Sequence, residues 1–285
     1  MKTKNIIAAA VAATLISAIF TSCGSENSTL AAPATKKAEN GKELTVIKGL
    51  ADLTPHSEIL EYIEPALNEK GYTVELVSTA SDSTWNEKVE NGEVDFNYMQ
   101  HEPYLKEWNE INNGDLINIG NIHVEPIAAY SEKYDTADEV PDGATIVIPN
   151  DATNEYRALR ILEQQGWIKL RQTEDIRASV DDIEEFIKPI EITELDSIQI
   201  NTHISEFDVY INNTNKVIEA GLDATKFLFR EGEDSPYANI IVTTPDKKDD
   251  PGLKALVEVL ETEDTAKFII EKYNGAVVPV TKVSE

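Results

Sequence analysis

The sequence lacks the features that mark common enzymes and nucleic-acid-binding proteins. It has no G-x-S-x-G elbow, no H-E-x-x-H helix and no G-x-x-x-x-G-K-[ST] loop, so hydrolase, metalloprotease and nucleotide-binding motifs are absent. Basic residues are scarce: 25 face 52 acidic ones, for a net charge of −27. So acidic a chain, without a basic cluster, repels nucleic-acid phosphates. We therefore expect no catalysis and no nucleic-acid partner, and we attribute the acidity to solubility.

A long apolar run stands at the N-terminus, where residues 6–20 follow Lys2 and Lys4. The segment is basic at its start, then apolar, and ends at a cleavage site of small residues, which predicts a secretory signal at residues 1–22. Its apolar part is too short for a membrane span. Thr21-Ser22-Cys23 resembles a bacterial lipobox, although phenylalanine precedes it where leucine is usual. The resemblance implies that Cys23 is acylated and anchors the mature protein in a membrane. A plain secretory signal with an incidental cysteine is the alternative.

Cys23 is the only cysteine. Its acylation would leave no thiol, which excludes disulfides, thiolate zinc sites and cysteine nucleophiles. Removal of residues 1–22 leaves 23 basic and 52 acidic residues, a charge of −29. Residues 23–43 are rich in Ser, Ala, Thr and charge without an apolar period, which predicts a flexible tether.

The remaining chain, about 240 residues, exceeds the usual size of one domain, so we expect two lobes. Strand patterns alternate with helix patterns from residue 44, and the alternation restarts at residue 144. This order predicts α/β lobes built on parallel sheets. The last strand and two helices are expected to complete the first lobe. Lobe 1 is thus predicted to comprise residues 44–131 and 237–285, and lobe 2 residues 132–236.

Two chain crossings, near residues 131 and 237, would leave a cleft between the lobes. Loops that follow strand carboxyl ends face such a crevice in open α/β sheets. One such loop is VIPNDATNEYRALRILE, residues 147–163, which places Arg157 in the first turn of a helix. A cation there costs up to ~1 kcal/mol. A carboxylate ligand would offset the cost, because free helix amides and a guanidinium can grip it together.

Pairing of Arg157 with a nearby acid is the alternative interpretation. If Arg157 instead holds a ligand, we expect Arg157→Ala to abolish binding with little loss of fold, since removing one partner of a desolvated charge pair costs ~2–5 kcal/mol.

Two further stretches follow predicted strands. The stretch NYMQHEPYL (97–105) contains Tyr98, Met99, His101 and Tyr104. These side chains could form the apolar and hydrogen-bonding wall of a binding pocket. They could equally belong to the core. The stretch YINNTNKVIEAGL (210–222) contains Asn212, Asn213 and Asn215. Their side-chain amides can bind a carboxylate or an ammonium group. The same residues are also common in helix caps and turns.

These stretches, with HVEP (123–126), PDGATIVIPND (141–151) and DSPYANIIV (234–242), resemble the NlpA-type lipoproteins, the methionine-binding components of bacterial ABC importers. The resemblance covers residues 44–279. It implies a type II periplasmic-binding-protein fold, a cleft that closes on a free L-amino acid, and no catalysis, cofactor or metal. It also implies a lipid anchor at the cell membrane, facing the periplasm or exterior, and as partners an ABC permease and its cytoplasmic ATPase.

The resemblance assigns ligand-binding roles to particular residues. Arg157 would hold the carboxylate, and Asn154 and Asn213 would fix the carboxylate and amine. The cleft lining would also include His101, His123, Glu125, Tyr98 and Met99, the last in place of a phenylalanine of the family pattern NFFQH.

Several residues depart from the family pattern. Tyr156 stands where a small residue is common, Lys216 where tyrosine is favoured, and Asp82 near a pocket tyrosine. Ala152 replaces a proline, Thr214 a glycine, and the loop at residues 49–56 is one residue longer. We count Tyr156 and Asp82 among the ligand-binding residues, where they would alter the side-chain pocket. Because one methylene in a pocket changes binding by only about 1–3 kcal/mol, we expect an amino acid ligand that is methionine, a derivative or a short peptide.

A metal receptor is the remaining alternative among binding proteins. Exported zinc receptors use histidines and acids, and this chain has His56, His101, His123 and His203. None of their spacings forms a compact local metal motif.

Overall fold

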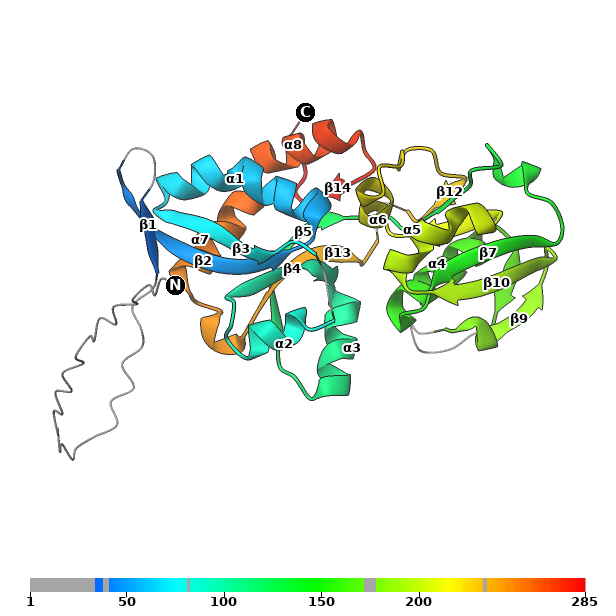
Figure 1. Ribbon diagram of the computed structural model, residues 1–285, viewed down its shortest axis with the longest axis horizontal. Helices are drawn as coiled ribbons and strands as arrows, with labels where there is room; N and C mark the ends of the chain where they lie inside the picture. Colours follow the sequence, from blue (N-terminus) through cyan, green and yellow to red (C-terminus); the bar gives the residue numbers. More distant parts are fainter. Residues whose placement is uncertain (1–33, 38–40, 81–82, 172–177, 233–234, 285) are drawn as a thin grey trace, which may run out of the picture. The chain divides into compact units, whose positions relative to one another are not determined.

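The computed structural model describes residues 34–37, 41–80, 83–171, 178–232 and 235–284. Two separate large sheets organise this part of the chain (Figure 1). The predicted signal, Cys23 and Asp82 lie outside the described residues. Among the helices described, none has the length and apolar character needed to cross a membrane.

The first sheet has seven strands in the order β1-β2-β4-β13-β5-β14, with β3 also paired to β2. The strands are β1 (Thr35–Lys37), β2 (Glu43–Ala51), β3 (Tyr72–Ser78), β4 (Phe96–His101), β5 (Ile117–Val124), β13 (Ala238–Thr243) and β14 (Val278–Pro279). β2 runs parallel to β3 and β4, but β13 is antiparallel to both β4 and β5. The predicted parallel sheet is therefore mixed, because the late strand β13 enters it between β4 and β5.

Five α-helices accompany this sheet: α1 (Glu58–Glu69), α2 (Trp85–Glu90), α3 (Glu102–Asn112), α7 (Pro251–Leu260) and α8 (Glu263–Tyr273). The side chains of β13 alternate between two apolar clusters, which shows that helices cover both faces of the first sheet. Ile240 and Val242 pack in one apolar cluster with Trp85 and Leu105 of the α2–α3 side. Ile241 packs in another with Leu256 of α7. Successive side chains of a strand point to opposite faces, so this sheet is buried between two helical layers.

The second sheet has five strands in the order β10-β7-β11-β6-β12. The strands are β6 (Ala128–Tyr130), β7 (Ala144–Pro149), β10 (Ile190–Leu195), β11 (Val209–Asn212) and β12 (Phe229–Arg230), and the α-helices are α4 (Ala152–Gln164), α5 (Ser197–His203) and α6 (Thr214–Glu219). β7 is parallel to β10 and β11, and β6 is antiparallel to β11 and β12. Along β7, Ile146 and Ile148 face one core and Val147 the other.

Short elements complete the described chain. β8 (Ile168–Leu170) and β9 (Ile183–Phe186) form a separate antiparallel pair. Single-turn helices are η1 (Leu53–Ser57), η2 (Ala137–Glu139), η3 (Val180–Asp182), η4 (Ile204–Glu206) and η5 (Pro245–Lys247). The type II periplasmic-binding-protein fold, α/β around two sheets, is confirmed.

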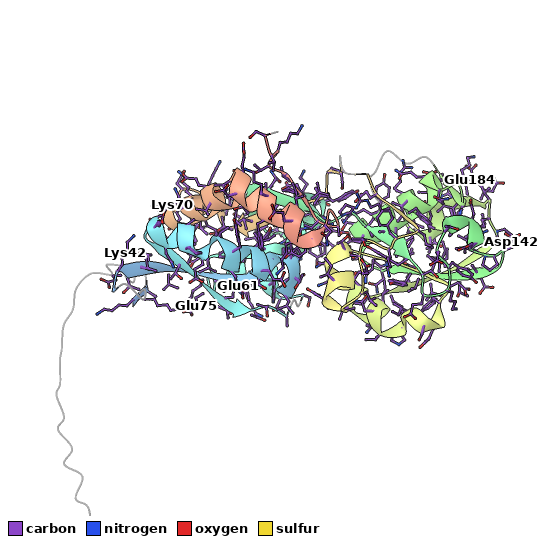
Figure 2. All side chains as sticks on the ribbon, turned by 90° about the horizontal axis from the view of Figure 1, so that it is seen from above. Lys42, Glu61, Lys70, Glu75, Asp142 and Glu184 are labelled. Carbon is purple, nitrogen blue, oxygen red and sulfur yellow. The ribbon has the colours of Figure 1, made fainter. Side chains whose placement is uncertain are left out.

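We propose that each sheet is the centre of one lobe, close to the predicted boundaries. β6 joins the second sheet although it precedes residue 131, so the first crossing lies before Ala128. The predicted tether also differs in part, because β1 pairs antiparallel with β2 and Thr35 Oγ1 donates to Glu43 at 2.7 Å. Charged side chains such as Lys70, Asp142 and Glu184 are exposed on both lobes, as expected for so acidic a chain (Figure 2).

Candidate functional site

A cavity of about 230 Å³ is lined by residues from both lobes. It meets the ends of several strands: Asp52 follows β2, His101 ends β4, Asp151 follows β7 and Asp196 follows β10. Parallel strands bring their carboxyl ends to one edge of a sheet, where ligands bind in open α/β folds. The remaining lining residues are Ser83, Met99, Gln100, Tyr104, Glu125, Asn150, Asn154, Ser197, Ile198, Asn213, Asn215, Lys216 and Asn239.

Three hydrogen-bond donors converge on the amide oxygen of Asn154. Asn154 lies in the first turn of α4, where Asp151 caps the helix by accepting from the Asn154 backbone N–H at 3.0 Å. Its Oδ1 accepts from Arg157 Nη1 at 3.1 Å and from Asn213 Nδ2 at 3.1 Å. His101 Nε2, from the other lobe, lies 3.3 Å from the same oxygen. We call Asn154, Arg157, Asn213 and His101 the Asn154 cluster.

The proton of His101 can be placed on Nε2. Its Nδ1 accepts from the Tyr104 backbone N–H at 3.2 Å, which leaves Nε2 to carry hydrogen. Burial and the nearby Arg157 cation lower the pKa of His101 to about 3. His101 is therefore a neutral donor toward Asn154 Oδ1 at physiological pH.

Arg157 is buried, with 2% of its surface exposed, and it is not among the residues that line the cavity. It lies in the second turn of α4, which begins at Ala152, and not in the first turn as the sequence predicted. Its Nε and Nη2 donate to the Glu231 carboxylate at 3.3 and 2.6 Å. Nη2 also donates to the Glu125 carbonyl at 2.9 Å, and the guanidinium lies 4.4 Å from the centroid of the Tyr237 ring. Arg157 thus pairs with an acid, the interpretation that the sequence left open. Glu231 was not predicted, because it is 74 residues away in the chain and belongs to no local pattern.

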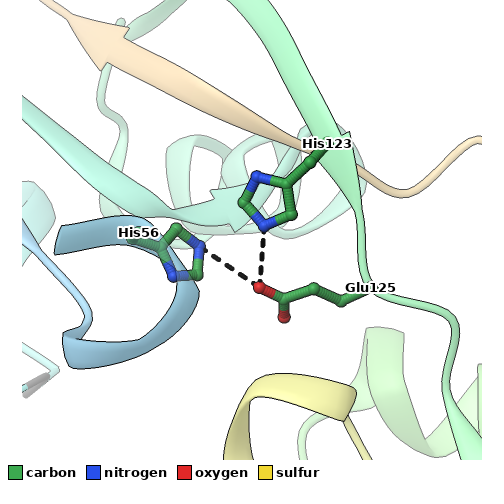
Figure 3. A group of neighbouring side chains, drawn as sticks. All are labelled: His56, His123 and Glu125. Carbon is green, nitrogen blue, oxygen red and sulfur yellow. Dashed lines mark hydrogen bonds and ion pairs between the residues drawn. The ribbon is translucent and has the colours of Figure 1, made fainter. Parts of the chain in front are cut away.

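A buried group of hydrogen-bonded side chains adjoins the cavity through Glu125 and Asn239. Figure 3 shows three of its members, His56, His123 and Glu125. Tyr98 Oη is 2.5 Å from His123 Nδ1, and His123 Nε2 is 2.8 Å from Glu125 Oε1. Burial raises the pKa of Tyr98, so its hydroxyl keeps its proton and donates to Nδ1, which places the imidazole hydrogen on Nε2 toward Glu125. His56 Nε2 lies 3.1 Å from Asn239 Oδ1 and 3.5 Å from Glu125 Oε1.

The charges in this chain of hydrogen bonds are suppressed by burial. Burial raises the pKa of Glu125 to about 7 and lowers the pKa of His123 to about 3. The pKa of His56 is also lowered, chiefly by burial. Both histidines are therefore neutral at pH 7. Only Glu125 and Asn239 of this group line the cavity, so Tyr98, His123 and His56 support its wall from behind.

The same atoms could hold a metal ion. Ligand atoms of His56, His123 and Glu125 lie within 4.8 Å of one another, all in buried side chains. Two imidazoles and one carboxylate are a common ligand set for first-row transition metals. The structure thus brings together two of the four histidines of the metal hypothesis. His101 belongs to the Asn154 cluster, and His203 Nδ1 lies 2.9 Å from the backbone oxygen of Gln199 in α5.

A second polar group joins the two lobes. Asp52 Oδ2 accepts from Asn215 Nδ2 at 3.1 Å and from Lys216 Nζ at 3.0 Å. Burial lowers the pKa of Lys216, but the carboxylates of Asp52 and Glu219 outweigh it, so the pKa is raised and Lys216 stays charged. We call Asp52, Asn215 and Lys216 the Asp52 cluster. Lys216 was singled out from the sequence, whereas Asp52 was missed, although its position directly after β2 is one that faces a crevice.

The other predicted residues divide between the cavity and the core. Met99 lines the cavity. Tyr156 packs against the apolar core of the second lobe and does not line the cavity, so its position gives no support for the ligand contact suggested by the sequence. The neighbour of Asp82, Ser83, lines the cavity. Asn239 lines the cavity but was not predicted as a site residue. It lies in the DSPYANIIV stretch, and its position near the start of β13 is the only signal that could have pointed to the site.

Two sheets of α/β build with a cavity lined from both are the architecture of the type II periplasmic-binding-protein fold. The NlpA lipoprotein family model matches residues 50–281, and the chain belongs to this family. The methionine-binding lipoprotein MetQ of Bacillus subtilis is 35% identical over 270 residues, 93% of this chain and 94% of that protein.

Two solved structures are similar as well. A nutrient-binding protein from Burkholderia cenocepacia, bound to methionine, is 32% identical with a TM-score of 0.78 and covers 82% of this chain and 99% of its own. An ABC transporter periplasmic substrate-binding protein from Coxiella burnetii is 33% identical with a TM-score of 0.77, covering 82% and 100%. The relatives are thus binding proteins.

Proposed function

We propose that this protein is an extracytoplasmic, lipid-anchored substrate-binding protein of an ABC importer. It binds an L-amino acid, methionine or a derivative, in the cavity between its lobes and delivers it to the permease, which a cytoplasmic ATPase drives. It performs no catalysis. Membership of the NlpA lipoprotein family and the names of the relatives support this proposal. Acylated Cys23 would supply the anchor.

The convergence of donors on Asn154 Oδ1 is the observation that carries the proposal. Arg157 Nη1, Asn213 Nδ2 and His101 Nε2 surround one oxygen at 3.1 to 3.3 Å. A ligand carboxylate offers the same kind of acceptor with more charge, and hydrogen bonds to charged groups contribute about 1.5–3 kcal/mol. We propose that a carboxylate oxygen takes up these donors when the ligand binds. His101 comes from the first lobe and the others from the second, so the same contact would hold the lobes closed.

The size of the cavity suits a small ligand. Its volume of about 230 Å³ is below the roughly 300–1,000 Å³ of sites for drug-sized molecules. Titration calorimetry of ligand-stripped, full-length protein against single amino acids and short peptides tests the proposal. We expect micromolar or tighter binding of at least one amino acid. Absence of any binder would refute the proposal, and mass spectrometry of denatured protein would identify a ligand that co-purifies.

The cluster of His56, His123 and Glu125 supports a second candidate function, capture of a transition-metal ion. Its own hydrogen bonds weigh against it, because His123 Nε2 is already 2.8 Å from Glu125 Oε1 and its proton would have to leave. Titration with zinc, followed by elemental analysis after dialysis, separates the two functions. Stoichiometric zinc that is lost in His123→Gln would establish the metal function.

A further inference from the structure

Two buried oxygen atoms on cavity-lining residues have no hydrogen-bond partner among the described residues. They are Asp52 Oδ1 and Asn215 Oδ1, on residues that are 3% and 4% exposed. Other unpartnered buried atoms in this part of the chain, such as Trp85 Nε1 and Asn109 Oδ1, belong to residues away from the cavity. An unsatisfied buried polar group is destabilising, because it has lost its hydrogen bonds with water and gained none in exchange. Two of them in one cavity wall therefore require an explanation.

These two oxygens belong to side chains that hold each other in place. Asn215 Nδ2 donates to Asp52 Oδ2 at 3.1 Å, and Lys216 Nζ donates to the same oxygen at 3.0 Å. Because the amide nitrogen of Asn215 is fixed on Asp52, its Oδ1 remains an acceptor. The second carboxylate oxygen of Asp52 remains an acceptor as well. Both unsatisfied acceptors thus belong to side chains of the cavity wall, where Asp52 and Asn215 are lining residues.

We propose that the Asp52 cluster is a subsite for an N–H donor at the end of the ligand's side chain. This inference rests on the proposed binding of an L-amino acid, and in place of methionine it names an amino acid whose side chain ends in a carboxamide. A carboxamide has two N–H donors, one for each acceptor, whereas a thioether has only a weak acceptor. Methionine would leave Asp52 Oδ1 and Asn215 Oδ1 unpaired.

Charge around the cavity limits the ligand further. Asp151 and Asp196 also line the cavity, and Lys216, the one lysine on its wall, is already paired with Asp52. A second carboxylate on the ligand would meet these acids and would be disfavoured. Sites built to bind a substrate NH reject an analogue that lacks it by large factors, because the site's own polar groups are left unpaired. The inference therefore concerns specificity and leaves the proposed carboxylate grip of the Asn154 cluster unchanged.

Glutamine and methionine form a matched pair of probes, since both have unbranched side chains of similar length. Calorimetric titration of ligand-stripped, full-length protein should give a Kd for glutamine at least tenfold below that for methionine. Equal affinities would mean that the α-ammonium group, which both ligands share, satisfies the Asp52 cluster, and they would overturn the inference. Tighter binding of methionine would overturn it too. If no amino acid binds, the proposed function fails and the inference fails with it.

Asn215→Leu removes one acceptor while keeping the approximate side-chain volume. The same change removes the bond from Asn215 Nδ2 to Asp52. Glutamine affinity should fall at least tenfold, and by more than methionine affinity falls. Asn109→Leu is the matched control, because Asn109 Oδ1 is also buried without a partner but lies in α3 away from the cavity; neither affinity should change there. A parallel loss for both ligands in Asn215→Leu, with folding intact by circular dichroism, would show a structural role and contradict the subsite. If this variant does not fold, the wild-type ratio decides.

Discussion

The two polar clusters at the cavity, in which every member except Arg157 is a lining residue, differ in how their hydrogen-bonding capacity is used. In the Asn154 cluster three donors share a single acceptor, and the cation Arg157 is neutralised by Glu231. In the Asp52 cluster two acceptor atoms have no donor. An excess of donors suits a carboxylate, and an excess of acceptors suits a group that carries N–H bonds. The comparison teaches that one cavity can recognise the two ends of a ligand by opposite imbalances.

Glu125 is the link between the clusters. Its backbone carbonyl accepts from Arg157 Nη2 at 2.9 Å, while its side chain lines the same cavity as Asp52 and Lys216. A change in the charge of Glu125 would therefore affect both the Asn154 cluster and the Asp52 cluster. The predictions below disturb the Asn154 cluster, then Glu125, then the Asp52 cluster.

Arg157→Ala should have the largest effect. Loss of a desolvated partner of the ligand carboxylate should weaken binding by about 2–5 kcal/mol, measured by calorimetry. The variant should also lose stability, against the expectation from sequence, because the partly buried carboxylate of Glu231 loses its partner. Urea unfolding measures this loss. Arg160→Ala, which removes a half-exposed arginine of the same helix, should change neither quantity.

The double variant Arg157→Met/Glu231→Gln separates the two effects. It removes both charges together, so stability should return toward the wild-type value while binding stays lost. Recovery of binding in this variant would show that Arg157 does not contact the ligand.

Glu125→Gln should change how stability depends on pH. Burial raises the pKa of Glu125 from 4.5 to about 7 in the folded protein, so the unfolded chain loses this proton first as pH rises. The stability contributed by protonated Glu125 is full below pH 4.5 and is lost as pH rises through 7. Glutamine cannot ionise, so the variant should gain up to about 3 kcal/mol relative to wild type across this range.

Urea unfolding of both proteins between about pH 4.5 and 8 measures this difference. His56 and His123 titrate in both proteins, so their contributions largely cancel in the comparison. A difference that stays constant with pH would contradict the raised pKa of Glu125.

Asn213→Ala removes one of the three donors and should weaken ligand binding by about 1.5–3 kcal/mol, since a hydrogen bond to a charged acceptor is lost. Stability should change little, because the Asn213 side chain makes no capping bond at α6 and its bond to Asn154 Oδ1 is one of three to that oxygen. Calorimetry on this variant and on the exposed control Asn121→Ala checks the expectation. Unchanged affinity in Asn213→Ala would remove Asn213 from the proposed site.

Sequence reasoning reached the Asn154 cluster more fully than the Asp52 cluster, for a physical reason. Asn154, Arg157 and Asn213 lie where strands β7 and β11 give way to helices, so local pattern and the family resemblance both marked them. Asp52 meets Lys216 across 164 positions of the chain, and no local period reports such a contact. Glu231 was missed for the same reason.

The fold shows the same limit. Alternating strand and helix patterns predicted α/β lobes, and helices do accompany both large sheets. Alternation of strands and helices could not show that β13 enters the first sheet antiparallel between β4 and β5. The direction of a strand depends on the path that the chain takes between the lobes. Composition and periodicity carry no information about that path.

The double variant Asp52→Leu/Lys216→Met should have the smallest effect on stability and should sharpen the comparison most. Replacing a buried ion pair by apolar residues of similar volume is often neutral or stabilising, so we expect a change in unfolding free energy within about 1 kcal/mol. The variant would turn the acceptor-rich wall apolar, and methionine should then bind at least as tightly as glutamine. Lys70→Met, which breaks the exposed pair of Lys70 with Glu258 on the first lobe, is the control and should leave the ligand preference unchanged (Figure 2). An unchanged preference for glutamine in the double variant would mean that the Asn154 cluster alone selects the ligand.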